Sequence, residues 1–221
     1  SVDTTSAFTA MSKLGIAGNF AMTGCCLMLS ACGQWSSAQS VPTTQLVTTT
    51  TTEPEVISAS GQRSGVSTKA AQKRLLSLGF WLLAPSGKYD ETTRQAVMAF
   101  QKYMGLEATA SVDQATADAL TLSTTRAVGK SNEPGTLVEI DKDKQVLFIM
   151  NAGKLLWALN ISTGSGQYFL EMNQKDLVTW ETGRSLTPSG RYKINREKSD
   201  GWWDGDLGQI YRPKYFNGGI A

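Results

Sequence analysis

The chain has 221 residues, with 21 basic and 19 acidic side chains and no histidine. This length accommodates two small domains, and the nearly balanced charge without a dense basic patch argues against nucleic acid as a partner. The cysteines are Cys25, Cys26 and Cys32. Cysteines confined to one short stretch predict no disulfide framework. Without a histidine or a fourth cysteine they predict no metal site, and we expect no cofactor.

The amino-terminal stretch has the pattern of a secretory signal. After Lys13 no charged residue occurs until Glu53, and residues 14–31 are apolar but diluted by glycine and polar residues. This is weaker than the roughly 20 strongly apolar residues that span a bilayer, whereas a short apolar region behind a positive residue is typical of a signal peptide. We predict a signal over residues 11–32 and interpret residues 1–10 as an upstream extension.

The end of this signal, Leu29-Ser30-Ala31-Cys32, resembles the lipobox of bacterial lipoproteins, whose cysteine receives a diacylglyceryl group and becomes the first residue after cleavage. The resemblance implies that Cys32 is lipidated. It also implies an anchor outside the cytoplasmic membrane, exposed to the cell wall. Acyl chains supply about 0.8 kcal/mol per buried methylene, which holds a soluble domain at a membrane. An uncleaved membrane anchor and a plain signal cut nearby are the alternatives.

Residues 33–65 show neither a helical nor a strand period. They are rich in threonine, serine and proline, with an unbroken threonine run over residues 48–52. Such a segment buries too little apolar surface to offset the entropy of ordering it. We predict a disordered tether between the lipid anchor and the first folded domain.

A short internal repeat predicts a small all-α domain over residues 66–122. Asp90 and Asp113, 23 residues apart, each follow a turn and precede a stretch with apolar residues at helical spacing. An aspartate at a helix N-cap accepts free backbone N–H groups of the first turn and contributes about 1 kcal/mol. The apolar spacing predicts helices over about 67–78, 91–103 and 114–121.

This domain resembles the peptidoglycan-binding domain type 1, a three-helix module, and the resemblance implies peptidoglycan as a partner. It departs at Ala110, where the family usually has glycine, so we expect a strained or shifted turn there. Trp81 is the candidate ligand contact, because an aromatic ring just after a helix stop would stack on a sugar; that it only covers the helix ends is an equally open reading. The matching positions are Gln72, Leu75, Leu78-Gly79-Phe80, Gly87-Lys88-Tyr89-Asp90, Thr93, Ala96-Val97, Phe100-Gln101, Gly105-Leu106, Val112-Asp113, Thr116 and Ala119-Leu120.

After a polar linker over residues 123–135, the apolar pattern of residues 136–221 becomes that of strands. Short polar turns between the first strands predict an antiparallel meander. A loop is expected over 165–185, and the last stretch, 208–221, reads as a strand. The other predicted strands cover 137–140, 145–150, 155–161 and 191–194.

The order of motifs in this second domain is Asn151-Ala-Gly-Lys, Ser162-Thr-Gly, Thr187-Pro-Ser-Gly and Asn217-Gly-Gly-Ile-Ala. It resembles the front half of the YkuD-type L,D-transpeptidase catalytic domain. The resemblance implies an incomplete YkuD-type fold, mainly antiparallel β. It also implies an enzyme that joins diaminopimelate to diaminopimelate through a thioester on a cysteine that histidine activates.

The family's reactive residues lie in a His-Gly pair and a Ser-His-Gly-Cys motif, and neither occurs in this chain. We therefore expect them beyond residue 221, assign no catalytic residue, and expect the 221-residue chain to be inactive. A peptidoglycan-binding lipoprotein without catalysis is the alternative.

Three further features remain. Asp200, Asp204 and Asp206 lack the final glutamate of an EF-hand loop, so we interpret them as a solvated turn. Trp202 and Trp203 either shape a substrate cleft or cover a sheet edge. The segment 167–184, with its aromatic residues, is a candidate border of the active site.

Overall fold

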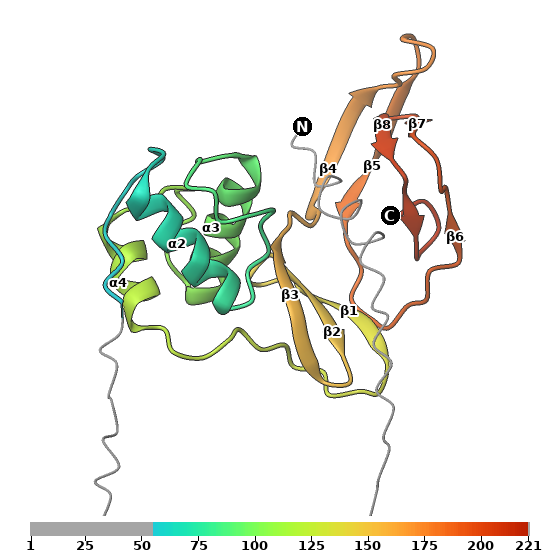
Figure 1. Ribbon diagram of the computed structural model, residues 1–221. Helices are drawn as coiled ribbons and strands as arrows, with labels where there is room; N and C mark the ends of the chain where they lie inside the picture. The colour runs from blue at the N-terminus through green and yellow to red at the C-terminus, as the bar shows by residue number, and fades with distance from the viewer. Residues whose placement is uncertain (1–54, 221) are drawn as a thin grey trace, which may run out of the picture.

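The computed structural model describes residues 55–220. Cys32 and the predicted signal lie outside the described residues. Three helices come first: α2 (Val66–Ser77), α3 (Glu91–Met104) and α4 (Gln114–Leu122). They pack together on one side of the strands that follow (Figure 1). Each predicted helix is confirmed to within one residue at either end.

The predicted aspartate caps are confirmed. The Asp90 carboxylate accepts a hydrogen bond from the Thr93 backbone N–H at 2.8 Å, and Asp113 accepts one from the Thr116 N–H at 2.8 Å. Because the two caps repeat with the same geometry, the internal repeat is a repeat of structure as well as of sequence.

The cap carboxylate of Asp90 is easier to ionise than usual. Partial burial opposes its charge, but hydrogen bonds from the backbone and hydroxyl of Thr93 and the hydroxyl of Thr92 outweigh burial and hold its pKa below the ordinary 3.8. A lowered pKa adds stability that is complete above the unfolded-state pKa and is lost as the pH falls through the folded-state value.

We expect Asp90→Ala to lower the free energy of unfolding by about 1 kcal/mol at neutral pH, and by less at about pH 2, because the contribution of the charged carboxyl declines once the pH falls below its ordinary pKa of 3.8. Urea denaturation of both proteins at the two pH values measures this. A cost that is the same at both would show that the charge on Asp90 does not matter.

A buried glutamine, Gln72 of α2, connects this helix to the turn that precedes α3. Gln72 is fully buried. Its Oε1 accepts from the Gly87 N–H at 2.7 Å, while its Nε2 donates to the Lys88 carbonyl at 2.8 Å and to the Thr93 hydroxyl at 2.7 Å. One side chain therefore pairs three buried polar groups of the neighbouring turn.

Gln101 repeats this arrangement in the second half. Its Oε1 accepts from the Ala110 N–H at 3.0 Å, and its Nε2 donates to the Ser111 carbonyl and the Thr116 hydroxyl, each at 2.9 Å. Ala110 takes the place of Gly87, with φ 55° against 87°. The strain expected at this turn is confirmed, because a left-handed backbone is unfavourable for alanine.

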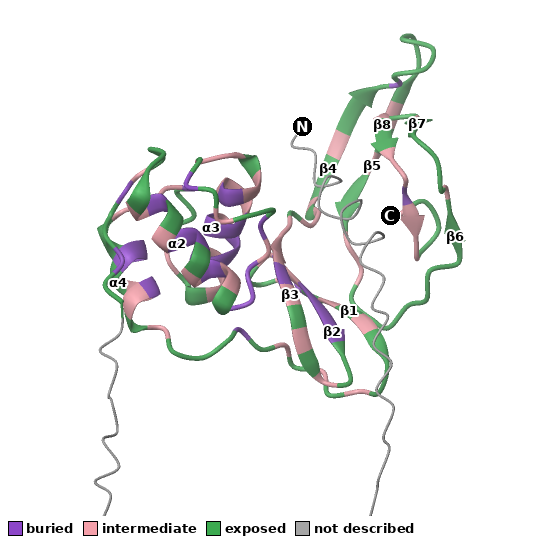
Figure 2. Cartoon of the chain, viewed as in Figure 1, coloured by how far each residue is buried: buried purple, intermediate pink, exposed green. Residues whose placement is uncertain are grey.

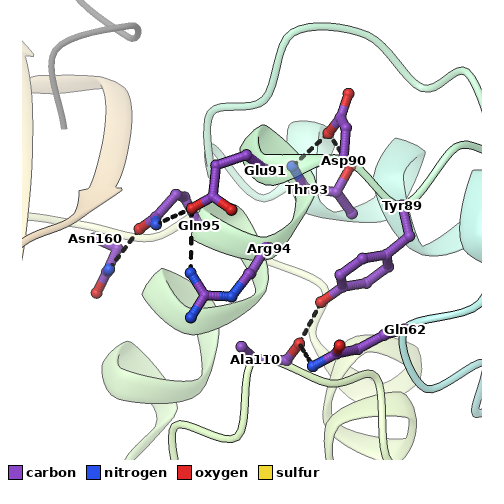
Figure 3. A network of polar contacts seen from close by, with 9 residues as sticks. All are labelled: Gln62, Tyr89, Asp90, Glu91, Thr93, Arg94, Gln95, Ala110 and Asn160. Atoms are coloured by element: carbon purple, nitrogen blue, oxygen red, sulfur yellow. Dashed lines mark hydrogen bonds and ion pairs between the residues drawn. The ribbon is translucent and has the colours of Figure 1, made fainter. Parts of the chain in front are cut away.

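Ala110 also joins the two halves of the module. Its carbonyl accepts a hydrogen bond from the Tyr89 hydroxyl and one from Gln62 Nε2 at 3.2 Å (Figure 3). Burial raises the pKa of Tyr89 to about 12, so this hydroxyl keeps its proton and acts as a donor throughout the ordinary pH range.

Replacing Gly87 by alanine should destabilise the module more than replacing Ala110 by glycine. At φ 87° a side chain is strained, and a Cβ would lie 3.0 Å from the Gly65 carbonyl oxygen. We expect Gly87→Ala to cost about 2 kcal/mol. For Ala110→Gly we expect a change within about 1 kcal/mol, since relieved strain and lost burial offset each other. Thermal denaturation of the two variants measures the contrast; equal effects would contradict it.

The predicted meander is confirmed. Strands β1 (Thr136–Asp141), β2 (Val146–Asn151) and β3 (Lys154–Asn160) form an antiparallel sheet in the order β1-β2-β3. The Asp141 carboxylate closes the first turn by accepting from the N–H groups of Asp143 and Lys144, at 3.1 and 3.0 Å. The second turn uses the positive φ angles of Ala152 and Gly153.

The prediction of a loop over residues 165–185 is wrong. The chain forms a hairpin there, with β4 (Ser165–Met172) paired to β5 (Trp180–Leu186). The turn between them is closed by Asn173, whose N–H donates to the Thr179 carbonyl at 2.7 Å. The hairpin extends away from the helices (Figure 1). Most of its residues are exposed, so it lacks the buried face on which strand prediction relies.

The strand predicted over 191–194 is also wrong. Tyr192 there packs its ring on Phe216, with centroids 5.4 Å apart, and the strand begins later. β6 (Arg196–Glu197) pairs with β9 (Lys214–Tyr215), and β7 (Trp202–Gly205) pairs with β8 (Gly208–Tyr211).

The last stretch is not one strand. Pro213 separates β8 from β9, since proline offers no N–H to a ladder, and a tight turn follows. The Ile220 N–H donates to the Asn217 carbonyl at 2.9 Å, and the Phe216 N–H donates to the Ile220 carbonyl at 3.0 Å. Gly218, at φ 57°, permits this turn.

One hydrophobic core runs through the helices and the first sheet. It joins α2, α3 and α4 to Val146, Phe148, Met150 and Ala158 of β2 and β3, and Figure 2 shows the buried positions concentrated there. The residues between the domains, 123–135, contain no helix or strand. Within them, the Ala127 N–H donates to the Leu78 carbonyl of the helical module at 2.9 Å.

A backbone bridge strengthens this contact. The Ala158 N–H donates to the Gly79 carbonyl at 2.8 Å, and the Trp81 N–H donates to the Ala158 carbonyl at 3.1 Å. The Tyr103 ring packs edge-on against Phe80 and Phe148, with centroids 5.7 and 6.0 Å apart. We call this contact of residues 79–81 and α3 with β2 and β3 the module–sheet interface.

Candidate functional site: a junction of two loops

Two motifs of the second domain meet in space. The motif loop, residues 162–164, leaves β3, and the second motif, residues 187–190, leaves β5. The Gly164 N–H donates to the Thr187 hydroxyl at 3.0 Å. The approach is so close that a Cβ on Gly164 would lie 2.4 Å from the Ser185 carbonyl oxygen. Glycine is therefore required at this position, and the contact defines the motif junction.

The side chain of Gln145 holds the motif loop from the other side. Its Oε1 accepts from the Thr163 N–H at 2.6 Å, and its Nε2 donates to the Thr163 hydroxyl at 2.6 Å and to the Lys142 carbonyl at 2.5 Å. Gln145 has φ 56°, which turns its side chain toward the loop. The amide thus acts as a substitute ladder partner for Thr163.

Lys142 does the same for the second motif. Its Nζ donates to the Thr187 carbonyl at 2.7 Å and to the Ser189 hydroxyl at 3.2 Å. Both motifs are therefore fixed by one turn, that between β1 and β2.

That turn is held by a largely buried carboxylate. The N–H of Lys144 donates to Asp141 and, against the opposing effect of burial and together with Lys130, holds the pKa of Asp141 below its usual range. Lys130 Nζ lies 3.1 Å from the Asp141 carboxylate. The turn therefore stays charged and closed at ordinary pH.

Chemically, the motif junction is built from threonine and serine hydroxyls and from backbone amides, and the N–H groups of Thr163 and Gly164 are already paired within the protein. A serine or threonine hydroxyl is a weak nucleophile without an adjacent base. The chain contains no histidine, and within residues 55–220 no group of three His, Cys, Asp or Glu side chains is placed to hold a metal ion. Among residues 55–220 the junction thus holds two motif loops together and contains no nucleophile–histidine pair.

Trp81 lies elsewhere, at the module–sheet interface. Its side chain is half-buried, and its backbone N–H takes part in the bridge to Ala158. Cys32 lies outside the described residues.

Two carboxylates of the aspartate-rich turn, Asp204 and Asp206, bond to other side chains of the protein. Asp206 pairs with Lys175 at 2.7 Å, and Asp204 accepts from Gln209 at 2.8 Å. Trp202 packs on Tyr211, with centroids 5.3 Å apart, and Lys198 Nζ lies 3.9 Å from the centroid of the Trp203 ring. These contacts join β7 to β8 and to the chain before it.

The sequence did not reveal Gln145 or Lys142 as site residues. Both belong to a polar turn of ordinary composition, and their partners are 18 to 47 residues further along the chain. Only the left-handed backbone at Gln145 distinguishes it, and that is visible only in the structure.

Comparisons with known proteins agree with this geometry. The model of the putative peptidoglycan binding domain matches residues 64–120, and that of the L,D-transpeptidase catalytic domain matches residues 135–220. A crystal structure of the L,D-transpeptidase from Xylanimonas cellulosilytica DSM 15894 is 35% identical in sequence, with a TM-score of 0.61, covering 71% of this chain and 72% of that chain. The chain belongs to the L,D-transpeptidase family.

A second crystal structure, of an L,D-transpeptidase (Yku) from Stackebrandtia nassauensis, matches at 19% identity with a TM-score of 0.30, covering 73% of this chain and 72% of that one. No curated protein sequence is similar enough to count as a relative.

The members of the L,D-transpeptidase family are enzymes, and the peptidoglycan-binding domain of this L,D-transpeptidase chain indicates peptidoglycan as a partner and the cell wall as its location. Among the helices of residues 55–220, none has the length and apolar character needed to cross a membrane.

Proposed function

We propose that this chain forms the wall-binding and substrate-orienting parts of an L,D-transpeptidase that joins the diaminopimelate of one peptidoglycan stem to that of another. The observation that carries the proposal is the presence, in one chain, of a peptidoglycan-binding module and an L,D-transpeptidase domain whose two motif loops meet.

The proposed reaction has two steps. A cysteine thiolate attacks the carbonyl carbon of the donor diaminopimelate, and the bond to the terminal D-alanine breaks as that amine takes a proton. The side-chain amine of an acceptor stem then attacks the thioester, forming the new amide and releasing the thiol. In this proposal the cysteine and its histidine base are supplied outside residues 1–221, because these contain no histidine.

The motif junction supplies orientation in this scheme. Holding two reactants in register replaces a bimolecular encounter by an effectively intramolecular one. The hydroxyls of Thr163, Thr187 and Ser189 each accept a hydrogen bond within the protein, which leaves their own O–H groups to donate. Such donors are suited to a stem peptide, which presents amide and carboxylate groups along its length. The helical module would keep the domain at its polymeric substrate.

We also propose that Cys32 carries a lipid and anchors the protein outside the cytoplasmic membrane, facing the wall. Its support is the Leu-Ser-Ala-Cys sequence. Cells that express the chain and receive labelled palmitate should incorporate label, Cys32→Ser should abolish it, and Cys26→Ser should retain it. Equal labelling of all three would remove the assignment of Cys32.

A second candidate is a peptidoglycan-binding lipoprotein without catalysis. The observation that favours it is the absence of any histidine from the 221 residues, together with the confinement of all three cysteines to residues 25–32.

Acylation by a carbapenem, followed by intact-mass measurement, separates the two candidates. The 221-residue chain should keep its mass, and a longer product of the same gene that carries the Ser-His-Gly-Cys motif should gain the mass of one inhibitor molecule. If no product of the gene carries that motif, or if the longer product is not acylated, the second candidate is the better account.

A further inference from the structure

Helix α3 of the binding module reaches the residues that lead into the motif loop of the catalytic domain. Lys102 Nζ donates to the Ile161 carbonyl at 2.9 Å, and Gln95 Oε1 accepts from Asn160 Nδ2 at 2.6 Å. Asn160 ends β3, and Ile161 directly precedes Ser162. Two side chains from one domain thus contact the entry to a loop of the other.

The Gln95 amide is itself held in place. Its Nε2 donates to the Glu91 carboxylate at 2.6 Å, and Arg94 pairs with the same carboxylate at 3.1 Å. Figure 3 shows these side chains in a row along α3 that ends at Asn160. Because the Glu91 carboxylate takes the Nε2 end, the Oε1 end is left facing Asn160.

On its opposite side, the loop is fixed by the β1–β2 turn. The Ile161 N–H donates to the Gln145 carbonyl at 3.3 Å, and the Gln145 side chain holds Thr163, as described above. Both backbone polar groups of Ile161 are therefore hydrogen-bonded, the N–H to the Gln145 carbonyl and the carbonyl to Lys102 Nζ.

The turn is tied to α3 as well. Lys144 Nζ donates to the Tyr103 carbonyl at 2.9 Å and lies 4.3 Å from the centroid of the Tyr103 ring. Tyr103 directly follows Lys102 and packs on Phe148 across the module–sheet interface. The helix end, the turn and the loop entry therefore form one connected set of contacts.

Lys102 is partly withdrawn from solvent, and the Ile161 carbonyl is its hydrogen-bond partner. It is half-buried, and burial lowers its pKa. Among residues 55–220 no carboxylate lies within ion-pair distance of it; its ammonium group is spent on the backbone carbonyl of Ile161. Partial burial disfavours the charged ammonium group, and the hydrogen bond to the Ile161 carbonyl offsets part of this cost.

We propose that α3 is a positioning element for the motif loop, with Lys102 and Gln95 as its positioning residues. The binding module then acts as a fixed part of the catalytic domain, and the peptidoglycan that it holds has a set distance and orientation relative to the motif junction. The relevance of this to catalysis rests on the proposed function; the coupling of α3 to the loop does not.

Amide hydrogen exchange of the full chain, followed by NMR without peptidoglycan, tests the coupling. In Lys102→Met we expect the amides of Thr163 and Gly164 to exchange about 3- to 10-fold faster, the loss that corresponds to one hydrogen bond, while the amide of Leu75 in the module core is unchanged. Gln95→Leu should act in the same direction. Lys102→Arg, which keeps a charged donor, should restore slow exchange, and Lys73→Met, on the exposed surface of α2, is the matched control.

Unchanged exchange at Thr163 and Gly164 in Lys102→Met would overturn the proposal. Equal acceleration at Leu75, or failure of Lys102→Arg to restore protection, would show that Lys102 supports the fold in general and would overturn it too. Binding of the variants to purified cell-wall sacculi is a separate measurement. Retained binding with unchanged loop exchange would remove this proposal alone, whereas loss of binding in the unmodified chain would count against the proposed function.

Discussion

Replacing Gln72 by leucine should lower the free energy of unfolding by about 3–5 kcal/mol, one of the largest effects we expect from a single exchange in this chain. The side chain is fully buried. Leucine would leave the buried Gly87 N–H without a partner and would remove the hydrogen bonds to the Lys88 carbonyl and the Thr93 hydroxyl, each worth about 0.5–1.5 kcal/mol. Each buried polar group left unpaired costs about 1–3 kcal/mol. Gln101→Leu should have a similar effect, because the same three kinds of contact recur there.

Urea denaturation followed by circular dichroism measures these losses. Gln114→Leu is the matched control, since the Gln114 side chain is exposed and bonds only to Asp118; we expect it to change stability by less than about 0.5 kcal/mol. A Gln72→Leu variant as stable as this control would show that the buried glutamine does not hold the turn.

The second large effect should come from Gly164→Ala. The new Cβ would lie 2.4 Å from the Ser185 carbonyl oxygen and 2.7 Å from its carbon. These are backbone atoms of β5, so neither can move aside without displacing the strand. The motif loop should therefore separate from the second motif and lose the hydrogen bond between the Gly164 N–H and Thr187, at a cost of about 2–3 kcal/mol.

The consequence for activity should be larger than that for stability. A displacement of about 1 Å in a positioning element can lower a rate by about 10²-fold, so we expect carbapenem acylation of a longer, catalytic product to slow by roughly that factor. Lys73→Met, at an exposed position of α2 outside every motif, is the control for folding. Unchanged acylation in Gly164→Ala would mean that the motif junction does not orient the reacting group.

The helical module was predictable because its signals are local. Asp90 and Asp113 mark the helix starts, Gly105 marks a helix end at φ 72°, and the apolar spacing covers less than 15 residues at a time. The repeat in sequence also pointed correctly to the turn at Ala110. Such features depend on neighbours a few residues away, which a sequence displays directly.

The second domain was predictable only where one face of a strand is buried. Every second residue of β2, namely Val146, Phe148 and Met150, is buried in the core, and this strand was predicted correctly. The β4–β5 hairpin was missed because Tyr168, Leu170 and Trp180 are exposed, so no consistent buried face announced the strands. The strand over residues 191–194 was predicted incorrectly, because Tyr192 in this segment packs its ring on Phe216 and belongs to no strand.

The contacts that define the candidate site could not be predicted, since all of them are non-local. Lys102 meets Ile161 across 59 residues, and Gln145 meets Thr163 across 18. Nothing in the sequence around Lys102 or Gln145 distinguishes a positioning residue from a solvated one. The division of the chain at residues 123–135 likewise gave no sign that Phe80 and Ala158 share one core.

Co-sedimentation of the full chain with purified peptidoglycan sacculi tests the central claim most directly. We predict that the unmodified chain pellets with sacculi and that a variant with Leu122→Ala, an exchange of an exposed apolar residue at the end of α4, pellets equally. If Trp81 stacks on a sugar, Trp81→Ala should weaken binding about tenfold, as expected for the loss of one aromatic stacking contact. An unmodified chain that remains in the supernatant would contradict the account that this member of the L,D-transpeptidase family holds the cell wall through its helical module.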